Sequence, residues 1–128
     1  MASLASPGIS YYDRAVGDDF DNWMVQLRKG FLELSVLAAL AGRERYGFDL
    51  VKSLAAIPGL GVGAGTLYPL LSRLRLQGLV RTRLEETSSG PARKYYALTP
   101  GGRRRLAAMR SHLASLVDGL DRLPEEEE

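Results

Sequence analysis

Cysteine is absent from the 128-residue chain, and histidine and tryptophan each occur only once. Without cysteine the chain cannot build a disulfide framework, a thiolate metal site or a thiol nucleophile, which suits a reducing compartment. One isolated histidine and no convergent set of carboxylates also leave no group of side chains suited to catalysis. We therefore expect neither an enzyme nor a protein that needs a metal or another cofactor.

Long apolar runs are missing as well. No stretch approaches the roughly 20 residues that a membrane span requires, and the first residues lack the basic-then-apolar pattern of a signal peptide. The sequence thus predicts a cytoplasmic protein with no membrane partner. Its length suits one domain with a modest core.

Charge is unevenly distributed along the chain, although the net charge is only +2. Residues 28–105 hold fourteen Arg and Lys against five Asp and Glu, a net +9, whereas residues 1–27 sum to −3 and residues 106–128 to −4. A basic centre favours binding to a phosphate backbone, because each neutralised phosphate releases condensed counterions. A solvated, arginine-rich surface is the plainer alternative.

The clearest structural pattern begins at residue 65. Four leucines at helical spacing predict one apolar helix face, and Gly78 is placed to end this helix in the left-handed conformation. The leucines are Leu67, Leu70, Leu71 and Leu74. Residues 79–84 alternate as a strand, and an aromatic-rich run over residues 94–98 predicts the returning strand, with a loop over residues 85–92 between them.

A helix followed by a hairpin that returns through Arg93 and Lys94 outlines a winged helix-turn-helix. In that fold the helix enters the major groove of DNA, and the hairpin, called the wing, lies over the backbone or the adjacent minor groove. Arg93 and Lys94 are suited to pair with phosphate or to insert into a narrow minor groove. The start of the helix offers Thr66 and Tyr68 but no Asn, Gln or Arg before Arg73, so few bidentate base contacts are available.

Two further helices are expected before this unit. The first follows a flexible arm over residues 1–20, has its N-cap at Asp21 or Asn22 and carries apolar residues up to Leu40. The second spans residues 46–56. Its candidate core residues are Phe48, Leu50, Val51 and Leu54.

The glycine-rich segment that comes next matches the spacing of a dinucleotide-binding fingerprint through Gly59, Gly61 and Ala64. That fingerprint requires a preceding strand and a βαβ unit, whereas here a helix precedes the segment and a hairpin follows it. We therefore interpret it as a turn between two helices, with small residues that let the backbone amides of the second helix approach a phosphate.

A last helix is expected over residues 99–123, with Thr99 as its N-cap. Its apolar residues are spaced alternately three and four apart, which predicts a heptad seam that packs on one partner helix. The seam consists of Leu106, Met109, Leu113, Leu116, Leu120 and Leu123. The basic cluster over residues 103–105 is either a DNA-flanking cluster or a solvated face, and residues 124–128 form an acidic tail.

Several of these blocks, in this order, resemble the PadR-type transcriptional regulators. The resemblance covers about residues 27–123, and matching several blocks over that length is more specific than any single short motif. The matching blocks are Tyr46-Gly47-Phe48-Asp49-Leu50, Gly65-Thr66-Leu67-Tyr68-Pro69-x-Leu71-x-Arg73-Leu74, Gly78-Leu79-Val80, and Gly90-Pro91-x-Arg93-Lys94-Tyr95-Tyr96-x-Leu98-Thr99-Pro100-x-Gly102.

The resemblance implies roles for residues outside the wing. It makes the helix over residues 46–56 the first helix of the helix-turn-helix, with Tyr46 and Lys52 near the DNA backbone. It also implies that the C-terminal helix pairs two winged domains across a two-fold axis, as in the short subfamily, so that the dimer reads a pseudo-palindrome. Related short regulators can hold flat aromatic compounds between their first and last helices. The last helix here has no Trp, which leaves Trp23 as the candidate ligand contact; core packing or a dimer contact is its plainer role.

Together these patterns predict a mostly α fold with a small β-hairpin, in which a winged helix-turn-helix over residues 21–98 precedes the C-terminal dimerisation helix. The predicted function is that of a homodimeric DNA-binding transcriptional regulator, a repressor released by a small-molecule effector. The alternative is a winged protein-interaction or ligand-binding module that does not bind DNA on its own. The predicted DNA-binding residues are Tyr46, Lys52, Thr66, Tyr68, Ser72, Arg73, Arg93 and Lys94.

Overall fold

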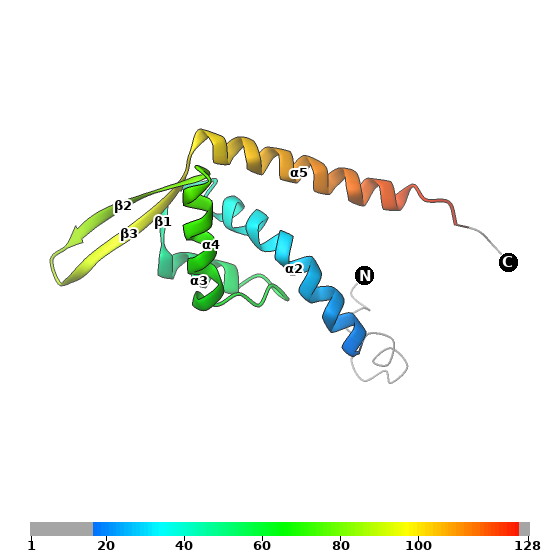
Figure 1. Cartoon of the computed structure of the whole chain (residues 1–128), viewed down its shortest axis with the longest axis horizontal. Helices are drawn as coiled ribbons and strands as arrows, with labels where there is room; N and C mark the ends of the chain where they lie inside the picture. Colours follow the sequence, from blue (N-terminus) through cyan, green and yellow to red (C-terminus); the bar gives the residue numbers. More distant parts are fainter. Residues whose placement is uncertain (1–16, 126–128) are drawn as a thin grey trace. The chain divides into compact units, whose positions relative to one another are not determined.

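The computed structural model describes residues 17–125 of the chain. Within them the chain forms mostly helices and a small antiparallel sheet, as the sequence predicted (Figure 1). The helices are α2 (Asp18–Ala39), α3 (Gly47–Ala55), α4 (Ala64–Leu76) and α5 (Pro100–Asp121); the strands are β1 (Arg45–Tyr46), β2 (Val80–Thr87) and β3 (Gly90–Leu98). No helix within residues 17–125 is long and apolar enough to cross a membrane.

The chain divides into two compact units, Met1–Phe31 and Leu32–Glu128, and the boundary falls inside α2. In the first unit α2 begins at Asp18, earlier than the predicted N-cap, so residues 18–20 of the predicted flexible arm are helical. An acidic residue in the first turn, Asp19, interacts favourably with the helix dipole, which accounts for the earlier start. Residues 1–16 of the predicted arm and residues 126–128 of the predicted acidic tail lie outside the described residues.

The second unit is built around the leucine face of α4. Leu67, Leu71 and Leu74 are fully buried and Leu70 is nearly so, which confirms the predicted apolar face. The other core side chains come from the end of α2 and the residue after it, from α3, from the segments on both sides of α4, from the sheet and from the start of α5: Val36, Leu37, Leu40, Leu50, Leu54, Leu60, Leu79, Val80, Tyr96, Leu98 and Leu106. The end of α2, the helices α3 and α4 and the start of α5 therefore contribute to one core.

The end of α4 follows the predicted glycine stop. Gly78 has a φ of +79°, and its N–H donates to the carbonyl of Arg75 at 3.0 Å. The next N–H, that of Leu79, reaches back to the carbonyl of Leu74 at 3.0 Å. This pair of bonds is a Schellman motif, which satisfies the last carbonyls of the helix and turns the chain directly into β2.

The sheet has three antiparallel strands in the order β1-β3-β2. The two-residue strand β1 was not predicted: Tyr46, expected at the start of a helix, pairs with Tyr95, and α3 begins one residue later at Gly47. Phe48 was expected in the core but is 60% exposed, because the buried face of α3 runs through Gly47, Leu50 and Leu54.

The wing is longer than the sequence indicated. The loop predicted over residues 85–92 is wrong, because β2 continues to Thr87, β3 starts at Gly90 and only two residues make the turn. The Thr87 hydroxyl lies 2.9 Å from the Gly90 carbonyl oxygen and holds the turn closed. Pro91 is tolerated in β3 because at this point the other side of the strand is a sheet edge, since β1 pairs only with Tyr95 and Tyr96.

The first turns of α5 are attached to the winged unit, and the rest of the helix extends beyond it (Figure 1). The Thr99 hydroxyl accepts a hydrogen bond from the Gly102 N–H at 2.9 Å, which confirms the predicted N-cap. Leu106, the first residue of the predicted seam, is buried in the core of its own chain. Met109 and Leu113 are half-buried, whereas Leu116, Leu120 and Leu123 are more than half exposed.

Candidate nucleic-acid interface

Helices α3 and α4 form the expected helix-turn-helix. The glycine-rich segment connects them, with φ values of +81° at Gly59 and +63° at Gly61, so it is a turn between helices and not part of a βαβ unit. The start of α4 contains no acidic residue, and Gly63, Ala64 and Gly65 leave its first amides uncrowded. A helix N-terminus of this kind favours the approach of a phosphate.

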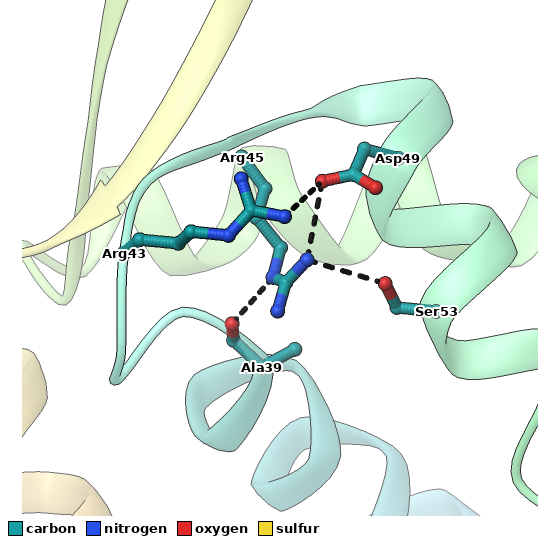
Figure 2. Close-up of polar contacts among 5 residues, drawn as sticks. All are labelled: Ala39, Arg43, Arg45, Asp49 and Ser53. Carbon is teal, nitrogen blue, oxygen red and sulfur yellow. Dashed lines mark hydrogen bonds and ion pairs between the residues drawn. The ribbon is translucent and has the colours of Figure 1, made fainter.

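An arginine clamp fixes α3 against the end of α2 (Figure 2). The Arg45 side chain donates from Nε to the Ala39 carbonyl oxygen at 2.8 Å and from Nη1 to Asp49 at 3.2 Å and Ser53 at 3.4 Å. Arg43 lies 3.6 Å from the same Asp49 carboxylate. Because the clamp joins a helix C-terminus to two side chains on one face of α3, it orients the first helix of the helix-turn-helix.

The outward face of α4 carries Thr66, Pro69 and Ser72, all exposed. Tyr68 is 40% exposed, and its ring lies so close to Gly47 that a Cβ there would meet the Tyr68 hydroxyl oxygen and the ring. Few of these side chains can make bidentate contacts with a base, as the sequence indicated. Thr66, Tyr68 and Ser72 are thus brought together on or beside the exposed face of one helix.

Arg73 has a different surrounding from the other predicted DNA-binding residues. Its guanidinium lies 3.5 Å from Glu33 of α2, and its side chain is about half exposed.

Lys52, on α3, is exposed and has its ammonium 5.6 Å from the centre of the Phe48 ring.

One face of the sheet carries four stacked side chains, which we call the wing stack: Tyr46, Arg83, Arg93 and Tyr95. Tyr46, Tyr95 and Arg83 are direct cross-strand neighbours on β1, β3 and β2. The Arg83 guanidinium lies 4.6 Å from the centre of the Tyr95 ring, the two tyrosine rings are 5.7 Å apart, and the Arg93 guanidinium lies 4.6 Å from the centre of the Tyr46 ring. These are cation–π and tilted aromatic contacts, which hold the base of the wing.

Glu44 extends the wing stack through an ion pair with Arg83. The Arg83 Nε lies 2.9 and 3.0 Å from the two carboxylate oxygens, and Arg83 Nη2 also donates to Glu44. This hydrogen-bonded pair lowers the pKa of the Glu44 carboxyl below its usual range and raises the pKa of the Arg83 guanidinium. Arg83 also lies 3.1 Å from Glu85, so two carboxylates share this cation.

Arg93 and Lys94 are on opposite faces of the wing. Neighbouring residues of a strand alternate in direction, so Lys94 shares a face with Tyr96, which is buried against the helices, and Arg93 shares a face with Tyr95. Lys94 is paired across the strands with Leu84, which is 68% exposed. Of the two neighbouring tyrosines of β3, Tyr96 is therefore the one that packs inward.

Comparison with known proteins decides which winged fold this is. A model of the transcriptional regulator PadR-like family matches residues 36–108, which span α3, α4, the wing and the start of α5. The chain belongs to the PadR-like family of transcriptional regulators. Membership in this PadR-like family makes it a DNA-binding regulator and not an enzyme, as the sequence predicted.

Individual PadR-like relatives agree. The transcriptional regulator Rv3488 of Mycobacterium tuberculosis is 34% identical over 94 residues, which cover 73% of this chain and 86% of that protein. A crystal structure of a PadR family transcriptional regulator from Eggerthella lenta has a TM-score of 0.74 and 37% identity, and the match covers 93% of this chain and 100% of that one. A PadR-like transcriptional regulator from Bacillus cereus has a TM-score of 0.65 and 31% identity, covering 77% of this chain and 99% of that one.

The sequence did not reveal the partners of the wing. Glu44 and Arg45 lie between two predicted helices, where no sequence pattern indicated a partner, yet they bind Arg83 on β2 and Asp49 on α3. The alternation of β2 predicts that Arg83 and Thr82 lie on different faces of the strand. Only the pairing of the two-residue strand β1 with β3 brings Tyr46 beside Tyr95. Within residues 17–125 no group of three His, Cys, Asp or Glu is arranged to hold a metal ion.

Proposed function

We propose that this PadR-like regulator is a homodimeric, cytoplasmic repressor that occupies a pseudo-palindromic operator. The observation that supports it best is the combination of a helix without acidic residues, α4, and a basic wing on one scaffold. Helix α4 enters the major groove, where Thr66, Tyr68 and Ser72 contact backbone and groove edges. Lys52 of α3 contacts the backbone beside it.

The two basic residues of the wing have different roles in this proposal. Lys94 shares its sheet face with Tyr96, and this is the face on which the helices pack. The wing therefore presents Lys94 on the same side as the helices that approach DNA, where its ammonium contacts a phosphate. Arg93 stacks on Tyr46 and supports the wing from the other face. Tyr46 contributes to DNA binding by supporting the wing through this stack. Arg73 contributes by holding α4 through its ion pair with Glu33.

Single substitutions separate the two wing roles. Binding of duplex DNA from the protein's own promoter region is measured by fluorescence anisotropy over a range of salt concentrations. Lys94→Ala should reduce the slope of log affinity against log salt by about two, because each of the two protomers in the bound dimer loses one phosphate contact. Arg93→Ala should weaken binding with little change in slope. Arg110→Ala, which removes one exposed charge from α5 instead, is the matched control.

Two results would count against this assignment. Equal slopes for Lys94→Ala and the control would remove Lys94 from the interface, and a lower slope for Arg93→Ala alone would reverse the two roles. Absence of binding at low salt would favour the alternative, a winged module that binds a protein or a ligand instead of DNA. Leu76, 78% exposed at the end of α4, is the observation that favours that alternative.

Release by a small-molecule effector is the remaining part of the proposal. Trp23 is 54% exposed and stacks on Phe20 with ring centres 5.4 Å apart, which gives an aromatic surface for a flat ligand. An effector can release the operator only if it binds one dimer geometry better than the other. Since Trp23 is the only tryptophan, its fluorescence should change saturably with a bound effector. A flat response across a panel of planar aromatic compounds would remove Trp23 from this role.

A further inference from the structure

Glu33 of α2 lies between arginines from two other helices. Its Oε1 is 3.5 Å from Nη2 of Arg73 on α4, and its Oε2 is 3.1 Å from Nη1 of Arg105 on α5. The Glu33 side chain is only 15% exposed, whereas the two arginine side chains are about half exposed. One carboxylate therefore connects the helix that reads DNA with the helix predicted to form the dimer.

The same end of α5, residues 99–106, is attached to the rest of its unit at other points as well, and we call this attached end the root. The Thr99 hydroxyl donates to the Gly78 carbonyl at 2.6 Å, and Arg103 Nη1 donates to the Ala41 carbonyl at 3.1 Å. Leu106 is buried in the core. Past this root the apolar residues of α5 become progressively exposed. Because a helix is stiff over a few turns, the direction of the root determines the direction of the exposed far end.

We propose that Glu33, by bridging Arg73 and Arg105, fixes the angle between α4 and α5 and thereby the spacing of the two recognition helices in the dimer. The inference rests on the proposed dimer. In a two-fold dimer joined through α5, any change in this angle moves both recognition helices relative to the axis, and half-sites must be spaced to match them. Glu33 is thus a positioning residue that acts on DNA through α4.

Stability alone does not account for this arrangement. Ion pairs with half-exposed arginines add little to the free energy of unfolding, whereas covering a carboxylate carries a desolvation cost. The geometry instead uses both oxygens of one carboxylate, one for each helix. A glutamine at this position keeps the size of the side chain, but its amide nitrogen cannot accept from an arginine. Glu33→Gln therefore disconnects one of the two helices without leaving a cavity.

The test measures the spacing of the two recognition helices directly. Since the chain has no cysteine, Leu76→Cys on α4, at a site that is 78% exposed, carries a single spin label in each protomer. Electron–electron distance measurements on the dimer should give one narrow peak for this otherwise unchanged protein. Glu33→Gln and, separately, Arg105→Gln should each lose that narrow peak and give a broad distribution, with the same dimer mass and nearly the same melting temperature. Glu86→Gln, which removes a carboxylate from the exposed wing, is the matched control.

The outcomes separate this inference from the proposed function. A dimer in which Glu33→Gln and Arg105→Gln keep the narrow peak of the control overturns the role of Glu33 but leaves the dimer in place. A protein whose mass remains that of a monomer overturns the dimer and the inference together. If Glu33→Gln fails to fold, Arg105→Gln, at a half-exposed residue, decides the question alone.

Discussion

Replacement of Gly102 by alanine should destabilise the protein, because the first turn of α5 lies directly against the backbone of Leu79, the residue before β2. A Cβ at Gly102 would lie 2.1 Å from the carbonyl oxygen of Leu79 and 3.1 Å from its carbonyl carbon. Both atoms belong to the backbone, so no side-chain rotation can relieve the overlap. The first turn of α5 or the start of β2 must move instead.

The expected cost follows from three terms. Overpacking of this kind costs about 1–3 kcal/mol. The movement also strains the hydrogen bond in which the Thr99 N–H donates to the same Leu79 oxygen at 3.1 Å, a bond worth about 1 kcal/mol. Alanine in a helix returns roughly 1 kcal/mol relative to glycine. The net loss is therefore about 1–3 kcal/mol, which should lower the melting temperature by roughly 4–12 °C.

The neighbouring glycine provides a matched control. A Cβ at Gly101 meets its nearest atoms, the Gly78 carbonyl oxygen and the Thr99 hydroxyl oxygen, at 3.6 Å, which is ordinary contact. Gly101→Ala should therefore leave the melting temperature unchanged or slightly raised, since it receives only the benefit of helix propensity. Thermal unfolding followed by circular dichroism, at one protein concentration, measures both variants. Equal melting temperatures for the two variants would refute the reasoning, because only the Cβ at Gly102 overlaps neighbouring atoms, above all the Leu79 backbone.

Two further predictions concern the wing and the recognition helix. Gly47→Ala should force the Tyr68 ring out of its place and weaken DNA binding with little loss of stability. The control Gly42→Ala should leave DNA binding unchanged, because a Cβ there meets nothing within 4 Å. Equal DNA affinities for the two variants would contradict the placement of Tyr68 in the interface. The pKa of the Glu44 carboxyl is lower in the folded state than in the unfolded state, where it is about 4.3. The ion pair with Arg83 therefore stabilises the protein fully at pH values above about 4.3, and this stabilisation is lost as the pH falls through the folded-state pKa. Urea unfolding should therefore show wild type more stable than Glu44→Gln at neutral pH, with the difference vanishing in acid; a difference that persisted at about pH 2 would refute the assignment.

The sequence by itself determined the elements whose cause is local. Four leucines at helical spacing define the buried face of α4, Gly78 ends that helix in the left-handed conformation, and Thr99 caps α5. Each of these depends on residues within a few positions of one another, and the residue types alone carry the signal. The order of these elements also outlined the winged fold, and the matching residue blocks carried the resemblance to the family.

Tertiary structure decided the contacts between distant segments. Two residues cannot signal a strand, so β1 and the partners of Tyr46 became visible only when β3 lay beside them. The wing extended through a Ser, Gly and Pro-rich stretch because cross-strand pairing outweighed local propensity. The carboxylate of Glu33 reaches Arg105 across 72 positions of sequence, and no local pattern marks that pair. Local propensity can place a side chain on a face of its own helix, but only the packing of helices decides which side chain of another helix it meets.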